Sequence, residues 1–185
     1  ITTFDSGGSS AELRRAFDMP AVGDIRARIM ALADRSLEGN PEIVELLGYR
    51  LPKDAGPEAL HRELASLASG AHPLVAAIPE PMNEVVTQHL SAFRSLMPVD
   101  MDLAGASIGN LILTSGYLSL DRQLEPVVRV FSGMVQARGV VMPVADSCAH
   151  LCVRLENGEV IVGQHRFTGK TATADQAEEV CAQIR

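Results

Sequence analysis

The residue types best suited to bind a phosphorylated ligand are concentrated in one short stretch near the start of the chain, Phe4-Asp5-Ser6-Gly7-Gly8-Ser9-Ser10. The apolar run before it, Ile1 to Phe4, predicts the end of a buried strand. Asp5 would then stand at the carboxyl end of that strand, the edge at which open α/β sheets bind ligands. A carboxylate at this place can hold a cation or a substrate hydroxyl.

The glycines and serines of this stretch favour close contact with an anion. Gly7 and Gly8 let the backbone approach a ligand, and Ser9 or Ser10 is a suitable cap for a helix that continues into Ala11-Glu12-Leu13-Arg14-Arg15. Amide groups at a helix N-terminus attract anions. We interpret the stretch as a nucleotide or sugar-phosphate site, with an ordinary strand-to-helix turn as the alternative.

A second candidate segment is Gly23-Asp24-Ile25-Arg26. Asp24 is a good N-cap for a helix from Ile25 to about Ala33. Arg26 lies in the first turn of that helix, where a cation opposes the helix dipole, so we expect it to have an anionic partner. That partner is a ligand phosphate or, in the alternative interpretation, a carboxylate such as Asp5 or Asp34.

A third segment, Ser107-Ile108-Gly109-Asn110-Leu111, opens a helix that continues to about Leu118. Gly109 is unfavourable inside a helix, by about 1 kcal/mol relative to alanine, and therefore predicts a close approach. Asn110 can both donate and accept hydrogen bonds, which suits base, ribose or phosphate recognition. The alternative is a glycine packed on a neighbouring helix, with Asn110 as a buried structural bracket.

Three further residues are of types that bind metal ions, but their spacing does not match a known metal-binding motif. Cys148, His150 and Cys152 alternate in a predicted strand, so they would share one face. Their spacing is not a standard zinc motif and a fourth ligand is missing. We therefore interpret them as two apolar thiols around a histidine.

The elements that must position these residues are mostly helices. Leu124 to Arg138 is strongly amphipathic and precedes a predicted strand, 140–144. Asn157-Gly158 predicts a type I′ turn in a hairpin over about 148–163. A helical excursion is expected over about 37–81. The remaining predicted helices are Pro41–Gly48, Pro57–Ser69, Met82–Met97 and 171–185.

Composition limits the classes of partner. The net charge of −7 argues against nucleic-acid binding, and no apolar run is long enough to span a membrane. Three cysteines favour reduced thiols, hence a cytoplasmic protein. The chain of 185 residues begins at Ile1 rather than methionine, and strand-like segments are few, so we expect one α/β domain that is incomplete at both ends.

Taken in order, the three glycine-containing segments, the Pro143-Val144 strand and the Asn157-Gly158 hairpin resemble the CofD-like family. This family includes 2-phospho-L-lactate transferase of coenzyme F420 synthesis and the YvcK-type bacterial proteins. The resemblance implies a Rossmann-like three-layer α/β sandwich with a mostly parallel sheet. It also implies magnesium and a GDP- or GTP-type ligand for a transferase, or a UDP-sugar for a YvcK-type protein.

The resemblance implies roles for individual residues. Asp5 would be the catalytic and metal-binding residue, and Arg26 would balance phosphate charge. Ser6 replaces a second acid found in many relatives, and Ala27 replaces a frequent asparagine, so a divergent branch is indicated. The remaining candidate binding residues are Gly7, Gly8, Ser9, Ser10, Asp24, Gly109 and Asn110.

Three functional hypotheses follow from the residues and the resemblance. The first is a nucleotide- or nucleotide-sugar-binding transferase of a phosphorylated group. The second is a UDP-sugar-binding regulatory protein without turnover, and the third is a structural or partner-binding module. The expected partners are a small phosphorylated molecule and, in a homodimer, a second copy of the chain.

Overall fold

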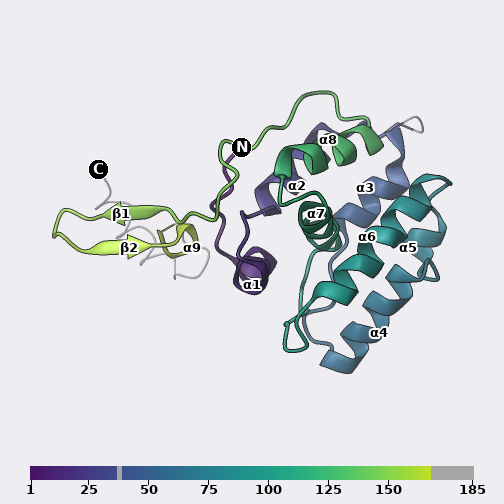
Figure 1. Cartoon of the computed structure of the whole chain (residues 1–185), viewed down its shortest axis with the longest axis horizontal. Coiled ribbons are helices and arrows are strands. Elements are labelled where there is room, and N and C mark those ends of the chain that lie inside the picture. Colours follow the sequence, from purple (N-terminus) through teal and green to yellow (C-terminus); the bar gives the residue numbers. More distant parts are fainter. Residues whose placement is uncertain (37–38, 168–185) are drawn as a thin grey trace.

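The computed structural model describes residues 1–36 and 39–167. Helices make up most of these residues, and a two-stranded hairpin projects from the helical body (Figure 1). In chain order the elements are α1 (Gly8–Phe17), α2 (Gly23–Leu32), α3 (Pro41–Gly48), α4 (Pro57–Ala68), α5 (Pro73–Ala76), α6 (Met82–Leu96), α7 (Ile108–Ser119), α8 (Leu124–Met134), β1 (Cys152–Arg154), β2 (Val160–Val162) and α9 (Gln164–Phe167).

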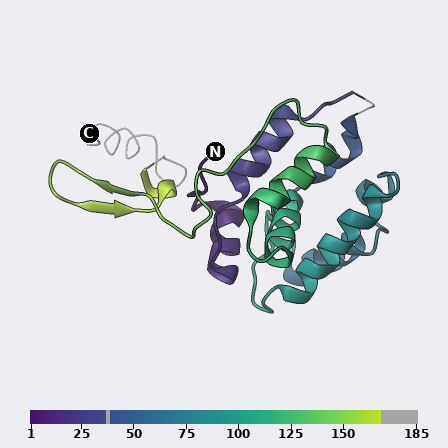
Figure 2. The same ribbon diagram turned by 45° about the horizontal axis from the view of Figure 1, so that its top comes forward.

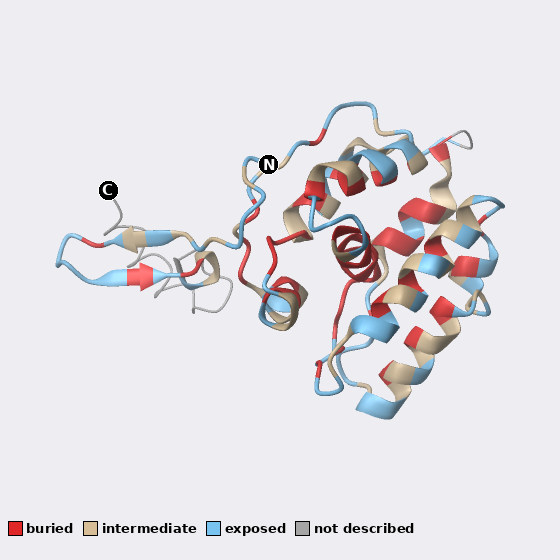
Figure 3. Ribbon diagram, in the orientation of Figure 1, coloured by how far each residue is buried: buried red, intermediate tan, exposed pale blue. Residues whose placement is uncertain are grey.

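Helix α7 is the centre of the body and is buried on all sides (Figure 3). It packs against α1, α2, α3, α6 and α8. Gly109 and Gly116 permit this crowding, because an added Cβ would lie 2.6 Å from the Leu47 carbonyl oxygen and 2.9 Å from Val127 Cγ1, respectively. A helix whose residues are apolar or small on every face can be surrounded by other helices in this way.

The segment predicted as a helical excursion, 37–81, contains α3, α4 and α5. Helix α4 packs along α6, and α3 packs on α7. Leu64, Leu67, Leu90 and Phe93 are fully buried between these helices. The helices of this segment therefore supply a large part of the core that holds α7 in place.

The predicted hairpin forms, but it is shorter than 148–163 and its turn differs from the prediction. Strand β1 begins at Cys152, so Cys148 and His150 do not share a strand with it as predicted. Strands β1 and β2 pair antiparallel, with Arg154 opposite Val160. Gly158 has φ +88°, and its N–H donates to the Leu155 carbonyl. Asn157 has no positive φ, so the turn is not type I′. The connection is a three-residue loop in which Gly158 takes the left-handed position.

The predicted parallel sheet is wrong for the described residues, whose only sheet is this antiparallel hairpin. The predicted strand segments 1–4 and 140–144 do lie side by side. The Ile1 amine donates to the Met142 carbonyl at 2.7 Å, and Val144 N–H donates to the Ile1 carbonyl at 3.0 Å. These bonds follow a parallel pattern, but they are too few to make a strand.

Of two other predicted helices, one ends earlier than predicted and one lies outside the described residues. Helix α8 ends at Met134 rather than near Arg138, because Gln136 takes a left-handed conformation with φ 46°. The predicted helix over 171–185 lies outside the described residues. No helix in the described part of the chain combines the length and apolarity needed to cross a bilayer.

The central position of α7 yields a stability prediction. Leu111 is 0% exposed, so Leu111→Ala should lower the free energy of unfolding by about 3 kcal/mol, through lost burial and a cavity. Leu96 on α6 is 51% exposed, and Leu96→Ala should change the free energy of unfolding by less than about 0.5 kcal/mol. Urea unfolding of both variants is the measurement, and equal losses would contradict the central role of α7.

Candidate functional site

The turn at the start of the chain is closed by its own carboxylate. Gly7 N–H donates to Asp5 Oδ1 at 3.1 Å, and Asp5 is only 8% exposed. Gly8 has φ +52°, a conformation that a side chain would strain. Helix α1 begins at Gly8, so Ser9 and Ser10 lie in its first turn rather than at the predicted cap position.

The beginning of α2 touches this turn. A Cβ added to Gly23 would lie 2.6 Å from Ser10 Oγ and 3.1 Å from Asp5 Oδ2. Helix α2 starts at Gly23, so Asp24 is in its first turn and is not the predicted N-cap. Instead, Asp24 Oδ2 accepts a long hydrogen bond, 3.5 Å, from the Thr2 hydroxyl.

Helix α7 brings the third predicted segment to the same place. Asn110 Nδ2 donates to Ser9 Oγ at 3.1 Å and lies 3.7 Å from the position of a Cβ on Gly23. Asn110 is 2% exposed, and its Oδ1 has no hydrogen-bond partner among the described residues. The first turns of α1, α2 and α7 therefore meet; we call this arrangement the three-helix junction and define it by Asp5, Ser9, Ser10, Gly23 and Asn110.

The three helix N-termini give the junction a partial positive charge. Each helix N-terminus carries amide groups without an intrahelical partner and a partial positive charge, which together attract phosphate or carboxylate. A buried amide oxygen without a partner is costly, so Asn110 also favours a ligand that donates a hydrogen bond. These two features come from segments about 100 positions apart in the sequence.

Among the predicted site residues, Arg26 points away from the three-helix junction. Its aliphatic stem passes Gly109, where an added Cβ would meet Arg26 Cδ at 2.7 Å. Its Nη1 donates to the Leu47 carbonyl at 3.3 Å, at the end of α3. The pKa of Arg26 is lowered, first by burial and then by Arg50. Neither carboxylate considered as its partner, Asp5 or Asp34, accepts a hydrogen bond from it in the described structure; Asp34 instead pairs with Arg138.

A cavity of about 440 Å³ lies beside the same turn, between α1 and the hairpin segment. Ser6 opens onto it, and Ser6 Oγ is 2.7 Å from His165 Nδ1. Its other lining residues are Ala11, Arg14, Arg15, Asp18, Cys148, His150, Val162 and Gly163. Sequence reasoning singled out His150 only as part of a weak metal pattern, and nothing in the spacing pointed to His165.

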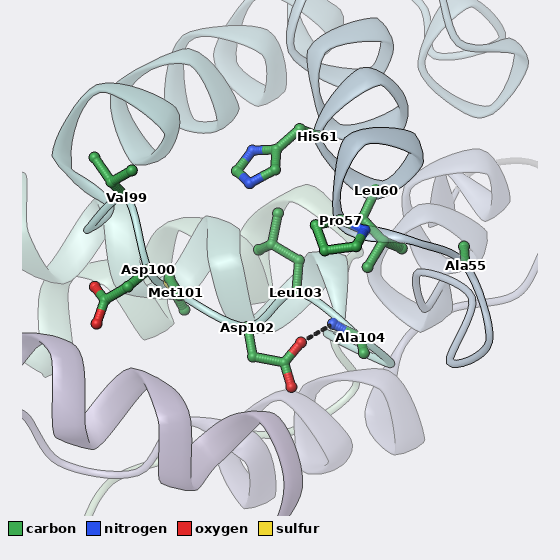
Figure 4. A pocket seen from close by; sticks show the side chains of 10 residues that line it. All are labelled: Ala55, Pro57, Leu60, His61, Val99, Asp100, Met101, Asp102, Leu103 and Ala104. Carbon is green, nitrogen blue, oxygen red and sulfur yellow. Dashed lines mark hydrogen bonds between the residues drawn. The ribbon is translucent and has the colours of Figure 1, made fainter.

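A second cavity, of about 450 Å³, lies between α4 and the 99–104 segment, with His61 and Leu103 among its lining residues (Figure 4). Asp102 there accepts a hydrogen bond from Ala104 N–H at 2.8 Å. None of the predicted site residues lines this cavity. No group of three or more His, Cys, Asp or Glu that could hold a metal occurs in the described residues.

Comparison with known proteins now identifies the family. The model of the family described as 2-phospho-L-lactate transferase CofD matches residues 1–184. The chain belongs to the CofD family. The resemblance noted from the glycine-containing segments is thereby confirmed.

Curated relatives match this chain over most of its length. The uncharacterized protein YNL011C of Saccharomyces cerevisiae is 32% identical over 177 residues, which cover 89% of this chain and 37% of that protein. The gluconeogenesis factor of Listeria monocytogenes is 26% identical over 164 residues, covering 89% of this chain and 35% of that protein. The chain thus spans little more than a third of the length of these relatives.

A solved structure also matches this chain. Protein BH3568 from Bacillus halodurans superposes with a TM-score of 0.58 at 22% identity, covering 92% of this chain and 38% of that one. A second structure of bh3568 describes it as a member of the upf0052 family. This likeness establishes the fold.

The contacts at the three-helix junction yield a second prediction. Gly23→Ala would place a Cβ 2.6 Å from Ser10 Oγ and 3.1 Å from Asp5 Oδ2, so these buried side chains must shift. We expect a loss of about 1–3 kcal/mol, typical of overpacking. Gly133 on α8 has nothing within 4 Å of such a Cβ, so Gly133→Ala should stabilise the fold by up to about 1 kcal/mol. Thermal unfolding measures both, and a stabilised Gly23→Ala variant would show that the junction is loose.

Proposed function

We propose that this CofD-family chain binds a phosphorylated small molecule, a nucleotide or nucleotide-sugar, at the three-helix junction. The observation that carries the proposal is the meeting of three first helical turns around the buried, unpartnered Asn110 Oδ1. Amide groups of α1 and α2 would bind phosphate oxygens, and Asn110 would bind a hydroxyl or base group of the ligand. Gly7 and Gly8 keep the turn free of side chains, which allows a phosphate to approach the backbone.

The reaction that fits such a site is transfer of a phosphorus-containing group to an acceptor hydroxyl. Catalysis of this kind depends mainly on placing the two reactants in line and neutralising the charge on the phosphate oxygens. The family description, a 2-phospho-L-lactate transferase, supports this class of reaction. Asp5 would orient the acceptor hydroxyl, because its Oδ2 faces the junction while its Oδ1 is held by Gly7 N–H.

The residues present fit magnesium as a helper of this reaction. Asp5, Ser10 and Asn110 offer oxygen atoms, the ligand type that magnesium prefers, and one carboxylate plus substrate phosphates is a common arrangement. Bound magnesium would supply positive charge against the phosphates. Asp24, one residue beyond Gly23, offers the nearest further carboxylate along the chain.

A regulatory protein that binds a UDP-sugar without turnover is the second candidate. One observation favours it: a curated relative is named as a gluconeogenesis factor rather than a transferase. The resemblance to the CofD-like family, in which Ser6 replaces an expected second acid, points the same way. The binding site would be the same junction. Turnover of a phosphorylated donor therefore separates the two candidates, whereas binding alone does not.

Calorimetry with GDP, GTP and UDP-N-acetylglucosamine, each with and without magnesium, tests the proposal. We expect at least one to bind, and Asp5→Asn to weaken the magnesium-dependent part by 10-fold or more, because one negative charge is removed. This substitution keeps the Oδ1 acceptor for Gly7 N–H. Asp54→Asn, on an exposed loop, removes the same charge and should leave affinity unchanged.

Two outcomes would contradict the proposal. If none of the three nucleotides binds, the third hypothesis, a structural or partner-binding module, is favoured. If Asp5→Asn and Asp54→Asn have equal effects, the junction carboxylate is not part of the binding site.

A further inference from the structure

The cavity between α1 and the hairpin segment carries an inference beyond the junction. Helix α1 lies between the hairpin and the rest of the body in both views (Figures 1 and 2). The cavity of about 440 Å³ falls within the usual range for small-molecule sites. Its lining includes two arginines and two histidines against a single carboxylate, Asp18. It is thus a cationic cavity in a chain of net charge −7.

Arg14 is the buried cation of this cavity. It is only 6% exposed. Its Nη1 donates to the carbonyls of Phe4 and Asp5, at 3.3 and 3.2 Å, and its Nη2 donates to the carbonyl of Ala149. Its Nε has no hydrogen-bond partner, and no carboxylate forms an ion pair with it, within the described residues. These neutral acceptors orient the guanidinium but do not balance its charge.

A guanidinium stays protonated in proteins, so Arg14 cannot avoid the cost of burial by losing its proton. A buried charge is stable only when it is paired or when its charge is otherwise compensated. An anion in the adjoining cavity would supply this missing charge. Arg15 at the rim is half exposed and already paired with Glu12, so it contributes less.

His150 adds a directed donor. Its Nε2 is 3.4 Å from Arg14 Nη2. An arginine nitrogen can only donate, so a hydrogen bond between these atoms assigns Nε2 as the acceptor and, in a neutral ring, the proton to Nδ1. His150 therefore has an N–H to offer on the side of the ring away from Arg14. The Ser6 hydroxyl, held by His165 Nδ1 and by His165 N–H at 3.2 Å, lines the same cavity.

We propose that this cavity binds the phosphate group of a second reactant, a small phosphate monoester, with Arg14 as its counter-charge and His150 as a hydrogen-bond donor. The inference rests on the proposed function, because it assigns the partner molecule of the junction's ligand. The two places are joined by consecutive residues: the Asp5 side chain reaches the junction, and the Ser6 side chain reaches the cavity. A phosphate monoester carries up to two negative charges and three strong acceptor oxygens, so it can accept from donors on several elements at once.

Titration with inorganic phosphate and with glycerol 3-phosphate, against acetate, tests the proposal by calorimetry and by the histidine ring signals in NMR. We expect both phosphates to bind and to shift the His150 signals, and acetate to bind at least 10-fold more weakly. His150→Ala should weaken phosphate binding 5-fold or more. His61→Ala, in the other cavity of about 450 Å³, is the matched control and should have no effect.

Arg14→Gln should abolish phosphate binding, provided that the variant folds; if it does not fold, His150→Ala decides. The proposal is overturned if phosphate binds equally well to His150→Ala and the unaltered chain, or if acetate binds as tightly as phosphate.

Asn110→Leu separates the two sites. Loss of phosphate binding in Asn110→Leu, but not in His150→Ala, would place the phosphate at the junction and disprove a cavity site. Phosphate binding that needs His150 while no nucleotide binds anywhere would support the cavity and contradict the proposed function.

Discussion

The arrangement of the candidate site depends on two places where the backbone of one helix comes too close to its neighbours for any side chain. Gly23 lets α2 contact the Asp5–Ser10 turn, and Gly109 lets α7 pass the stem of Arg26 and the end of α3. Because α7 is enclosed on every side, its first turn has little freedom to move. Asn110 is thereby fixed against Ser9, and three segments far apart in the sequence become one polar neighbourhood inside an otherwise apolar body.

Local patterns predicted the helices well, because amphipathic spacing and proline starts act within a few residues. Pro41–Gly48 is correct at both ends, and Pro57 is the first residue of α4 as predicted. The parallel sheet failed because its evidence was a run of apolar residues, which cannot show whether a strand will find neighbours. Segments 1–4 and 140–144 do find each other, through two backbone bonds, and no further strand joins them in the described residues.

The sequence predicted the arrangement of the candidate site only in part, for a similar reason. Glycine, serine and asparagine in three segments indicated where the backbones approach closely, and the contacts of Gly23 and Asn110 show that these segments meet. Ligand binding by these residues stays a prediction. The direction of Arg26 could not be read, because it depends on where α3 ends in space. The cationic cavity was missed because Arg14 and His150 meet only after the chain has passed through the whole helical body.

The step from Asp5 to Ser6 has a consequence for how this protein can evolve. Adjacent side chains serve two different surroundings: one faces the start of α2, and the other faces His165. Inserting or deleting one residue between Asp5 and Gly8 would shift these side chains relative to α1 and so change which of them meets which surroundings, even if composition were unchanged. The length of this turn should therefore be under stronger selection than the identity of its small residues.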